Sequence, residues 1–371
     1  MKRLLVFLLI LAALLSLCLP CSAEALSLSA KSAILMDAET GQVLYQKDAF
    51  VRLPMASTTK IMTAIVALEN SNLEDEIEVS PKATGIEGSS IYLYPNERLT
   101  MESLLYALLL ESANDAATAI AIAISGSVEA FAEKMNQKAD MLGLINTHFE
   151  NPHGLDSKEH YTTAYDLAKL SAYALSNPQF ERICSTYKKN ISLNGDKGVR
   201  VLVNHNKMLQ IYEGTLGVKT GYTKKSGRCL VSAAERDGLR LIAVTLNAPN
   251  DWQDHSALLD FGFSCYTRVT VAKKATHAVT IPVVGGEVTT LAAVNAEDLA
   301  ATLNKDHGEI TCKIEAPRFL YAPIKTGERV GRLVYLCDGK EIAACDLVAE
   351  TTAASASRGG FFLRLFSFFK K

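Results

Sequence analysis

The chain has 371 residues, 49% of which are hydrophobic, and a formal net charge of −2. This length and apolar content predict a large buried core divided over two or three domains. A near-neutral charge without an internal basic run argues against a nucleic-acid-binding protein, so we expect no nucleic-acid partner.

The first residues have the pattern of an export signal. A Lys-Arg pair at positions 2 and 3 precedes an apolar run over residues 4–17, and the small residues Cys21-Ser22-Ala23 suit a cleavage site. The apolar run is too short to span a bilayer comfortably. We therefore predict a signal peptide over residues 1–23, cleaved after Ala23 or alternatively after Ala25, and an exported protein.

A hairpin and a helix are expected next. Residues 31–47 alternate in polarity around Thr40-Gly41, which predicts a β-hairpin. The stretch PMASTTKIMTA (residues 54–64) then opens an apolar helical run. Ser57 has two interpretations there: it caps the helix, or it is a nucleophile whose base is Lys60, three residues on and on the same helix face.

The middle of the chain predicts helices followed by strands. Residues 102–125 are apolar and Ala-rich, which favours one or two buried helices interrupted near Ser112-Ala113-Asn114. Residues 162–176 predict a helix capped by Thr162 or Thr163. Strand patterns separated by Gly/Asp turns follow from 214 to 247. An early strand, many helices and late strands indicate an α+β fold in which N- and C-terminal strands share one sheet.

The last third predicts a β domain and an amphipathic end. Residues 270–350 hold short strand patterns and Gly/Asp turns. In the final FFLRLFSFFKK (residues 361–371), a helical wheel puts Arg364, Ser367 and Lys371 on one side and Phe and Leu on the other. Such a helix, about 16 Å long, can lie in a membrane interface but cannot cross the bilayer. A terminal helix docked on the core is the alternative.

Three short motifs carry the candidate chemistry. They are Ser57-x-x-Lys60 at a helix start, Ser112-x-Asn114 in a helix break, and Lys219-Thr220-Gly221 on a strand. The established signature of penicillin-binding proteins and class A β-lactamases is the same combination, except that it has an aspartate in the middle of the second motif, where this chain has Ala113.

Each of the first two motifs has a physical role available. Ser57 Oγ would attack an amide carbonyl carbon, with Lys60 as the proton acceptor. Ser112 would pass that proton to the leaving amine. Asn114 offers both a donor and an acceptor to a substrate peptide bond.

The strand motif suits recognition of an anion. Lys219 supplies a positive charge for a terminal carboxylate, and Thr220 can donate a hydrogen bond to it. Gly221 removes a side chain so that substrate can approach the strand. The backbone N–H groups of Ser57 and Tyr222 are the expected oxyanion-hole pair.

With these motifs the chain resembles the low-molecular-mass penicillin-binding proteins, the serine-type D-alanyl-D-alanine carboxypeptidases of peptidase family S11. The resemblance includes three further stretches, NPHGLD (151–156), HYTTAYDLAKL (160–170) and GRCLVSAAERDG (227–238). It implies a serine β-lactamase/transpeptidase-like domain, an antiparallel sheet with a helical cluster, followed by a small all-β domain. The domains would be residues 24–268 (catalytic), 269–352 (β domain) and 353–371 (linker and amphipathic membrane-anchoring tail).

The resemblance also implies an activity and partners. The enzyme would remove the terminal D-alanine from peptidoglycan stem peptides through an acyl-enzyme on Ser57, without a cofactor or metal. β-Lactam antibiotics would acylate the same serine. The protein would act at the outer face of the bacterial cytoplasmic membrane or cell wall, anchored peripherally through its tail.

Alternative functions make different demands on the sequence. A class A β-lactamase needs a glutamate that activates the deacylating water, and no Glu-x-x-Leu-Asn stretch lies between Asn114 and Lys219. A non-catalytic penicillin-recognising or wall-binding protein would be expected to lack Ser57 or Lys60. A lipase or esterase would carry a G-x-S-x-G elbow, which is absent.

The histidines stand apart from these motifs. Without a carboxylate cluster at ligand spacing, we expect His153 and His160 to structure a loop rather than to act as a base or metal pair. His205 lies where some relatives carry a carboxylate-binding arginine, and it receives no role. Tyr222 replaces a histidine found in some relatives, which leaves only its backbone role.

Two further patterns remain. Lys325-Thr326-Gly327 repeats the strand motif in the β domain, where we expect an ordinary strand-to-turn element. Six cysteines follow the signal, and we expect scattered buried thiols rather than a disulfide framework. Only Cys337 and Cys345, near Asp338-Gly339, suggest a hairpin pair.

Overall fold

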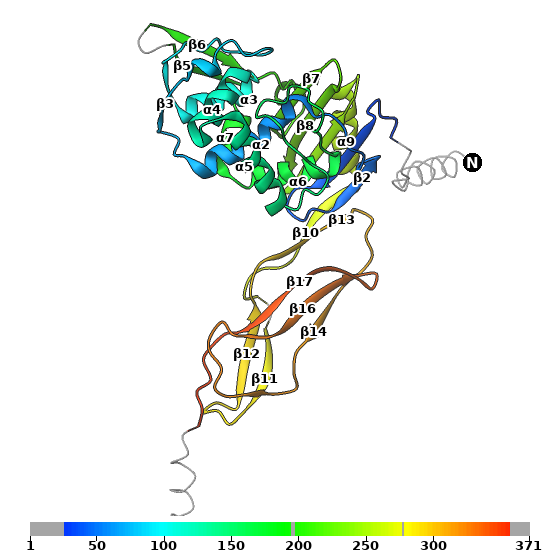
Figure 1. Ribbon diagram of the computed structural model, residues 1–371. Coiled ribbons are helices and arrows are strands. Elements are labelled where there is room, and N and C mark those ends of the chain that lie inside the picture. The colour runs from blue at the N-terminus through cyan, green and yellow to red at the C-terminus, as the bar shows by residue number, and fades with distance from the viewer. Residues whose placement is uncertain (1–25, 194–196, 277, 357–371) are drawn as a thin grey trace, which may run out of the picture. The chain divides into compact units, whose positions relative to one another are not determined.

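The computed structural model describes residues 26–193, 197–276 and 278–356. The predicted signal peptide and the amphipathic residues 361–371 lie outside this part of the chain. The chain forms two compact units, with the boundary between Cys265 and Tyr266. The first mixes helices with a sheet and the second is all-β, so the predicted fold class is confirmed (Figure 1).

The first unit is built on a five-stranded antiparallel sheet with the order β2-β1-β9-β8-β7. Its strands are β1 (Ser32–Asp37), β2 (Val43–Lys47), β7 (Thr215–Thr223), β8 (Gly227–Arg236) and β9 (Leu239–Leu246). β1 and β2 form the hairpin expected for residues 31–47, turning near Gly41, whose φ of +71° favours glycine. Because β1 also pairs with β9, the early and late strands join one sheet, as predicted.

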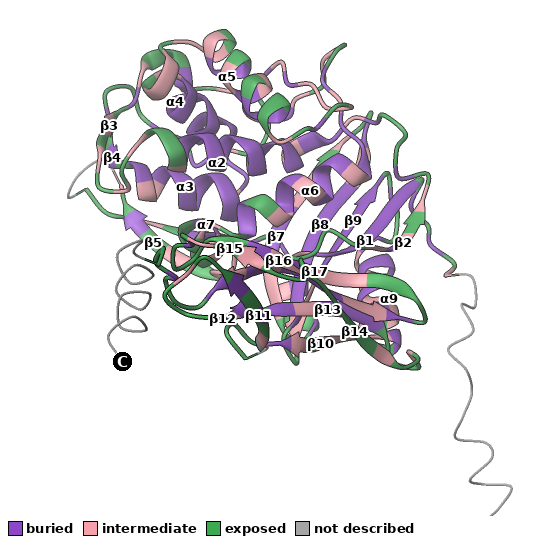
Figure 2. Cartoon of the chain, turned by 90° about the horizontal axis from the view of Figure 1, so that it is seen from below, coloured by how far each residue is buried: buried purple, intermediate pink, exposed green. Residues whose placement is uncertain are grey.

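Helices cover both faces of the sheet (Figure 2). They are η1 (Ala56–Thr59), α2 (Lys60–Asn70), η2 (Pro81–Ala83), α3 (Met101–Leu110), α4 (Asn114–Ser125), α5 (Val128–Met141), α6 (Ala164–Leu175), α7 (Pro178–Cys184), α8 (Met208–Ile211) and α9 (Asp251–Cys265). α6 packs on β1 and β9 from one side and α9 from the other (Figure 2). Consequently β8 and β9 are almost wholly buried.

Two predicted helix boundaries are confirmed. The 102–125 stretch divides into α3 and α4, and the break contains Ser112 at φ +59°. Thr163 caps α6 by accepting a hydrogen bond from the Asp166 N–H at 3.0 Å. The sequence did not suggest helix α9, which ends at Cys265, the last residue of the first unit.

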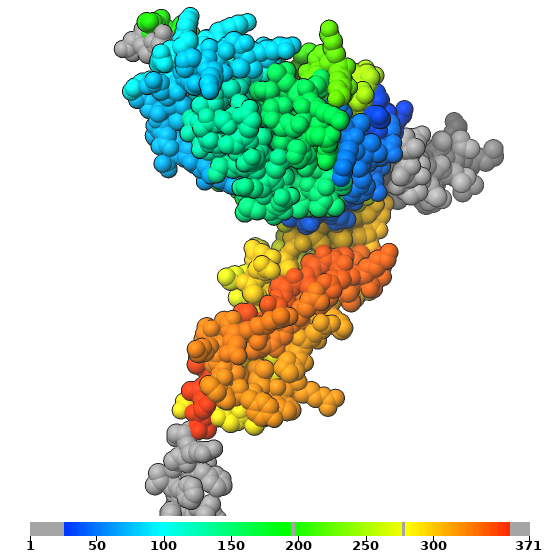
Figure 3. Space-filling model, viewed as in Figure 1, coloured from blue at the N-terminus to red at the C-terminus, as the bar shows by residue number. Residues whose placement is uncertain are grey.

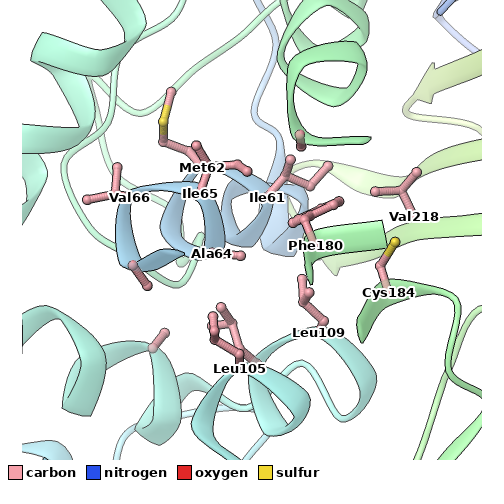
Figure 4. Packing of buried hydrophobic residues seen from close by; sticks show 14 of the residues in the cluster. Ile61, Met62, Ala64, Ile65, Val66, Leu105, Leu109, Phe180, Cys184 and Val218 are labelled. Atoms are coloured by element: carbon pink, nitrogen blue, oxygen red, sulfur yellow. The ribbon is translucent and has the colours of Figure 1, made fainter. Parts of the chain in front are cut away.

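The main core lies around α2, which is buried on nearly all sides (Figure 4). Ile61 and Ile65 belong to one cluster with Leu105 and Leu109 of α3 and Phe180 of α7. Truncating a buried Ile or Leu of this kind to Ala typically costs about 2–5 kcal/mol. The helix that begins at Lys60, directly after the 3-10 turn with Ser57, is therefore held rigidly.

Two small two-stranded antiparallel sheets complete the first unit. They are β3 (Glu76–Glu78) with β4 (Arg98–Thr100), and β5 (Lys188–Ser192) with β6 (Val199–Val203). Arg200 on β6 binds the buried carboxylate of Glu97 through two guanidinium nitrogens and also donates to the Ile91 and Tyr92 carbonyl oxygens. This ion pair fixes the β5–β6 pair to the loop before β4.

The second unit contains a two-stranded and a six-stranded sheet, ordered β10-β13 and β14-β16-β17-β12-β11-β15. The strands are β10 (Tyr266–Ala272), β11 (Ala278–Val284), β12 (Thr290–Asn295), β13 (Leu299–Asn304), β14 (Ile310–Glu315), β15 (Leu320–Tyr321), β16 (Arg329–Cys337) and β17 (Lys340–Ala349). Leu291, Leu333 and Leu347 lie at the centre of its core.

The suggested Cys337–Cys345 pair is wrong, because both thiols are free. Across the β16–β17 hairpin, Cys337 faces Lys340, whereas Cys345 faces Leu333. The two cysteines are therefore four residues apart along β16, about 13 Å, and a disulfide needs Cα atoms within about 7 Å.

The second Lys-Thr-Gly motif forms a turn, as expected. Glu328 N–H donates to the Lys325 carbonyl at 3.0 Å, and Gly327 has φ +80°. Lys325 is exposed. The same three letters therefore occupy different environments in the two units.

Within the described ranges no single helix is both long and apolar enough to cross a membrane; only α4 and α5 taken together, bent by 83°, satisfy length and composition.

Candidate active site

Ser57 lies in a 3-10 turn that continues directly into α2. Ala56, one residue earlier, has φ +48°. The turn is held by the Thr58 and Thr59 hydroxyls, which donate to the Met55 and Ala56 carbonyls at 2.6 and 2.8 Å. Ser57 makes no capping hydrogen bond, so the capping interpretation is wrong. Its hydroxyl instead faces Lys60.

Lys60 is fully buried and has three oxygen partners. Its Nζ lies 2.9 Å from Ser57 Oγ, 2.7 Å from Asn114 Oδ1 and 2.6 Å from the His153 carbonyl oxygen. Burial, with the nearby charge of Lys219, lowers the pKa of Lys60 well below its usual value against the opposing effect of Asp115. The structure thus brings two of the predicted residues together and favours a neutral amine beside the hydroxyl.

Asn114 joins Lys60 because a loop fixes its side-chain amide. Its Nδ2 donates to the Glu87 carbonyl at 2.6 Å, which turns Oδ1 towards Lys60. Its backbone N–H donates to the Ser89 carbonyl at 2.7 Å. Gly88 lies so close that a Cβ there would be 2.8 Å from Asn114 Nδ2. The loop therefore sets the orientation of the amide.

Asp115, the next residue of α4, binds the same loop. Its buried carboxylate accepts from the Ser90 hydroxyl at 2.6 Å and from the Leu93 N–H at 3.0 Å. Ser112, before the helix, is nearly buried and lines the same cavity as Ser57. The break between α3 and α4 therefore places Ser112 at the cavity and Asn114 against Lys60.

The strand motif forms the opposite wall. Lys219 is buried on β7, where its Nζ donates to the Thr220 carbonyl at 3.0 Å, and burial lowers its pKa to about 7. Thr220, Gly221 and Tyr222 line the cavity with Ser57. A Cβ on Gly221 would lie 3.0 Å from Ser57 N, so the strand needs glycine there to pass the nucleophile turn.

A loop at residues 151–154 contacts the start of α2, next to the 3-10 turn that carries Ser57. Besides the His153 carbonyl on Lys60, the Pro152 carbonyl accepts from the Thr63 hydroxyl at 2.6 Å. Asn151 Oδ1 accepts from the Gly154 N–H at 2.7 Å and so closes the loop on itself. The NPHG sequence therefore positions the base.

His160 also acts on the turn rather than on substrate. Its Nδ1 accepts from the Glu150 N–H at 3.0 Å, so Nε2 carries the proton and donates to Thr59 Oγ1 at 2.8 Å. Thr59 in turn donates to the Ala56 carbonyl. Burial lowers the pKa of His160 to about 4 and that of His153 to about 3, which keeps both rings neutral at pH 7. In the part of the chain that the structure describes, no three His, Cys, Asp or Glu side chains form a metal-ligand group.

Replacing Gly154 with alanine is expected to disrupt this support. Gly154 has φ +89°, and a Cβ there would lie 1.9 Å from the Ala56 carbonyl oxygen. The strain and overlap should lower the free energy of unfolding by about 2–4 kcal/mol, and the displaced turn should slow acylation of Ser57 about a hundredfold or more. Thermal unfolding and the acylation rate measure these effects.

Gly85 provides the matched control, because its φ is +71° but no atom lies within 4 Å of an added Cβ. Gly85→Ala should lower the free energy of unfolding only by the strain of an alanine at positive φ, and its acylation rate should stay at the wild-type value. Equal losses in both variants would contradict the supporting role of Gly154.

The cavity has a volume of about 720 Å³ and includes residues that the motifs did not reveal. Arg228 and Trp252 line it, and the Arg228 guanidinium lies 5.5 Å from the Trp252 ring centre. Arg228 Nε also donates to the buried carboxylate of Asp251 at 2.9 Å. Ser89 lines the cavity as well. GRCLVSAAERDG contains Arg228, but its spacing alone gives no reason to place the arginine in the site.

His205 lines the cavity while its Nε2 lies 3.1 Å from Glu111 Oε2, and its side chain is half exposed. Tyr222 is exposed at the cavity mouth. All eight predicted site residues thus belong to one region, in which six line the cavity or bind Lys60 directly: Ser57, Ser112, Asn114, Thr220, Gly221 and Tyr222.

Comparison with known proteins agrees with this geometry. The family model described as D-alanyl-D-alanine carboxypeptidase matches residues 20–250, and the model of the C-terminal domain of penicillin-binding protein 5 matches residues 266–354. The chain is 35% identical to D-alanyl-D-alanine carboxypeptidase DacF of Bacillus subtilis (strain 168) over 86% of this chain and 85% of that protein. It is 32% identical to D-alanyl-D-alanine carboxypeptidase DacC of Escherichia coli (strain K12), over 93% and 88%.

Solved structures are similar over both units. The chain matches penicillin-binding protein 5 from Haemophilus influenzae with a TM-score of 0.77 and 27% identity, covering 89% of this chain and 98% of that one. It matches PBP3 from Streptococcus pneumoniae, described as a peptidoglycan synthesis regulatory factor, with a TM-score of 0.74 and 28% identity, covering 88% and 100%. The chain therefore belongs to the D-alanyl-D-alanine carboxypeptidase family, the low-molecular-mass penicillin-binding proteins of family S11.

Proposed function

We propose that this protein is a serine-type D-alanyl-D-alanine carboxypeptidase that uses Ser57 as its nucleophile and Lys60 as the base. The observation that carries the assignment is the 2.9 Å contact between the buried Lys60 amine and the Ser57 hydroxyl, beside a cavity that Ser57 lines together with Thr220 and Gly221 of the strand motif. A hydroxyl is a weak nucleophile until a base takes its proton, and a lysine held out of water provides that base. Family membership supports a hydrolase of this class.

In the proposed acylation, neutral Lys60 takes the Ser57 proton as Oγ forms a bond to the carbonyl carbon of the penultimate D-alanine. The C–N bond of the terminal amide then breaks, and the proton passes through Ser112 to the leaving D-alanine amine. Ser112 suits that position because it lines the same cavity as Ser57. Water then attacks the ester carbonyl carbon and gives one proton to Lys60. As the C–Oγ bond breaks, Lys60 returns this proton to Ser57 Oγ, which regenerates the serine and releases the shortened stem peptide.

The backbone N–H groups of Ser57 and Tyr222 are proposed to hold the oxyanion. The closeness of β7 to Ser57 N, where a Gly221 Cβ would lie 3.0 Å away, supports this pairing. Thr220 and the charge of Lys219 would bind the terminal carboxylate, and Asn114 would orient the substrate amide. β-Lactams carry a carboxylate beside a reactive amide and would acylate Ser57 by the same route.

The direct test combines intact-protein mass with product release. Benzylpenicillin should add one adduct to the wild type and none to Ser57→Ala, and diacetyl-Lys-D-Ala-D-Ala should lose D-alanine only with the wild type. An adduct that hydrolyses rapidly without D-alanine release would mean a β-lactamase. No adduct on the folded protein would mean a non-catalytic wall-binding relative.

The domain limits and the location complete the proposal. The active domain would cover residues 24–268 and the β domain 269–352, after removal of a signal peptide at 1–23. Residues 353–371 would link and anchor the enzyme to the outer face of the cytoplasmic membrane. The support is the export-signal pattern at the start and the apolar and basic composition of FFLRLFSFFKK.

Removing residues 361–371 should release the protein from membranes without loss of activity on the soluble peptide, because the cavity lies wholly in the first unit. Sedimentation with membranes and D-alanine release measure the two effects. Truncated protein that still sediments would contradict the anchoring role.

A further inference from the structure

The second unit carries an exposed apolar patch near the last described residues of the chain. Val284, Val288, Phe319 and Tyr321 have exposed fractions of 47, 42, 46 and 70%. We call these four side chains the aromatic edge. Large apolar side chains that cluster on a surface commonly mark a contact with another surface.

The four residues are neighbours in the fold rather than scattered. β11 and β15 are parallel, with Val284 opposite Tyr321. Phe319 and Tyr321 meet edge to face, with ring centres 5.3 Å apart. Val288 lies on the turn after β11, which closes where the Val283 N–H donates to the Thr289 carbonyl.

The end of the described chain runs along the same turn. Glu287 N–H donates to the Ala354 carbonyl and Ala356 N–H donates to the Gly285 carbonyl, each at 2.9 Å. Figure 3 shows this end of the second unit, where yellow, orange and red atoms meet. Residues 357–371 follow in the sequence, and they include FFLRLFSFFKK. Four residues, 357–360, separate Ala356 from Phe361, which is about 17 Å of chain at full extension. A surface that FFLRLFSFFKK binds is therefore within reach of the aromatic edge.

Charge around the edge has both signs. Arg318 and Lys325 are exposed near it, and so are Glu287 and Glu328. Neither a polyanion nor a polycation is therefore favoured as the occupant. An aromatic pair with a phenolic hydroxyl, flanked by mixed charges, suits the boundary between water and lipid.

We propose that the aromatic edge inserts into the interfacial layer of a lipid bilayer, as a second membrane contact beside the C-terminal tail. This inference rests on the proposed membrane location. Two contacts on either side of Ala356 would fix the orientation of the β domain on the bilayer, whereas one anchor alone would leave it free to rotate.

A single-tryptophan probe tests the proposal in the full mature chain. Trp252 is the only tryptophan, so Trp252→Phe gives a silent background. In that background Phe319→Trp reports on the edge. Lys340→Trp is the matched control, since Lys340 is exposed at the far end of β17, about 30 Å along the strand from Ala349.

The probes are read on vesicles of equal parts phosphatidylcholine and phosphatidylglycerol. The tryptophan at 319 should shift its emission to shorter wavelength and be quenched by brominated lipid, and the tryptophan at 340 should do neither. The variant Phe319→Ser with Tyr321→Ser should bind vesicles about tenfold more weakly, because two half-exposed aromatic rings lose their lipid contact.

Vesicle-bound protein with an unshifted tryptophan at 319 would overturn the proposal. A shifted emission without vesicles would also overturn it in two cases. If the shift is lost on deleting residues 357–371, the tail covers the edge; if it is lost on dilution, a second copy of the chain covers it. If the full chain does not sediment with vesicles, the proposed anchoring by the tail is contradicted. A chain whose residues 357–371 are replaced by a polyhistidine tag on nickel-chelating lipid then tests the edge separately.

Discussion

Lys60→Ala should acylate with benzylpenicillin about a thousandfold more slowly than the wild type, since a positioned general base typically contributes 10²- to 10⁴-fold. The variant lacks the only amine in contact with the Ser57 hydroxyl among the described residues. Its fold should persist, because the substitution removes a buried amine whose charged form is disfavoured there. The measurement is the time course of adduct mass, with thermal unfolding measured in parallel.

Lys138 provides a matched control. It is another buried lysine, on α5, and its Nζ pairs with Glu69 at 2.7 Å outside the cavity. Lys138→Ala should lose stability but acylate at the wild-type rate. Wild-type acylation by Lys60→Ala would show that the base lies elsewhere.

The second large effect is a fall in kcat/KM on the alkaline side. Lys219 binds a carboxylate only when protonated, and burial lowers its pKa to about 7. Lys219 is therefore half charged in the free enzyme near pH 7, almost fully charged about one pH unit below that value, and progressively less charged above it. Above that value kcat/KM for diacetyl-Lys-D-Ala-D-Ala should fall about tenfold per pH unit.

A substrate without the terminal carboxylate isolates this cause. The methyl ester diacetyl-Lys-D-Ala-OMe offers nothing for the Lys219 charge to bind, so its kcat/KM should not show the alkaline fall. Lys219→Arg should move the fall to higher pH for the peptide, because a guanidinium stays protonated. An identical alkaline fall for both substrates would assign it to another group.

The parts of the site that lie close in sequence could be predicted. Ser57 and Lys60 are three residues apart at a helix start, and helical geometry brings such residues together. Lys219-Thr220-Gly221 lies on β7, within the stretch where strands were expected. That Asn114 joins Lys60, 54 residues away, came from the order of the motifs and the family resemblance, because local patterns do not determine such contacts.

The supporting residues could not be predicted, because their roles come from long-range packing. Nothing in the local pattern around Glu87 shows that its carbonyl orients Asn114, and a Gly/Ser-rich stretch looks like any surface loop. Arg228 and Trp252 meet in the cavity only because β8 and the start of α9 converge there. The glycine in NPHGLD gave the clearest available signal, since a backbone at positive φ pressed against another chain segment needs glycine.

The three oxygen partners of Lys60 determine the direction in which the lone pair of its neutral amine points. A protonated amine has three hydrogens and can donate to Ser57, Asn114 and His153 at once. A neutral amine has two hydrogens and one lone pair. The His153 carbonyl and Asn114 Oδ1 have no proton to offer, and Asn114 cannot turn its amide because Nδ2 is bound to Glu87. The lone pair can therefore face only the Ser57 hydroxyl, so that losing one proton reverses a single hydrogen bond and leaves the other two in place.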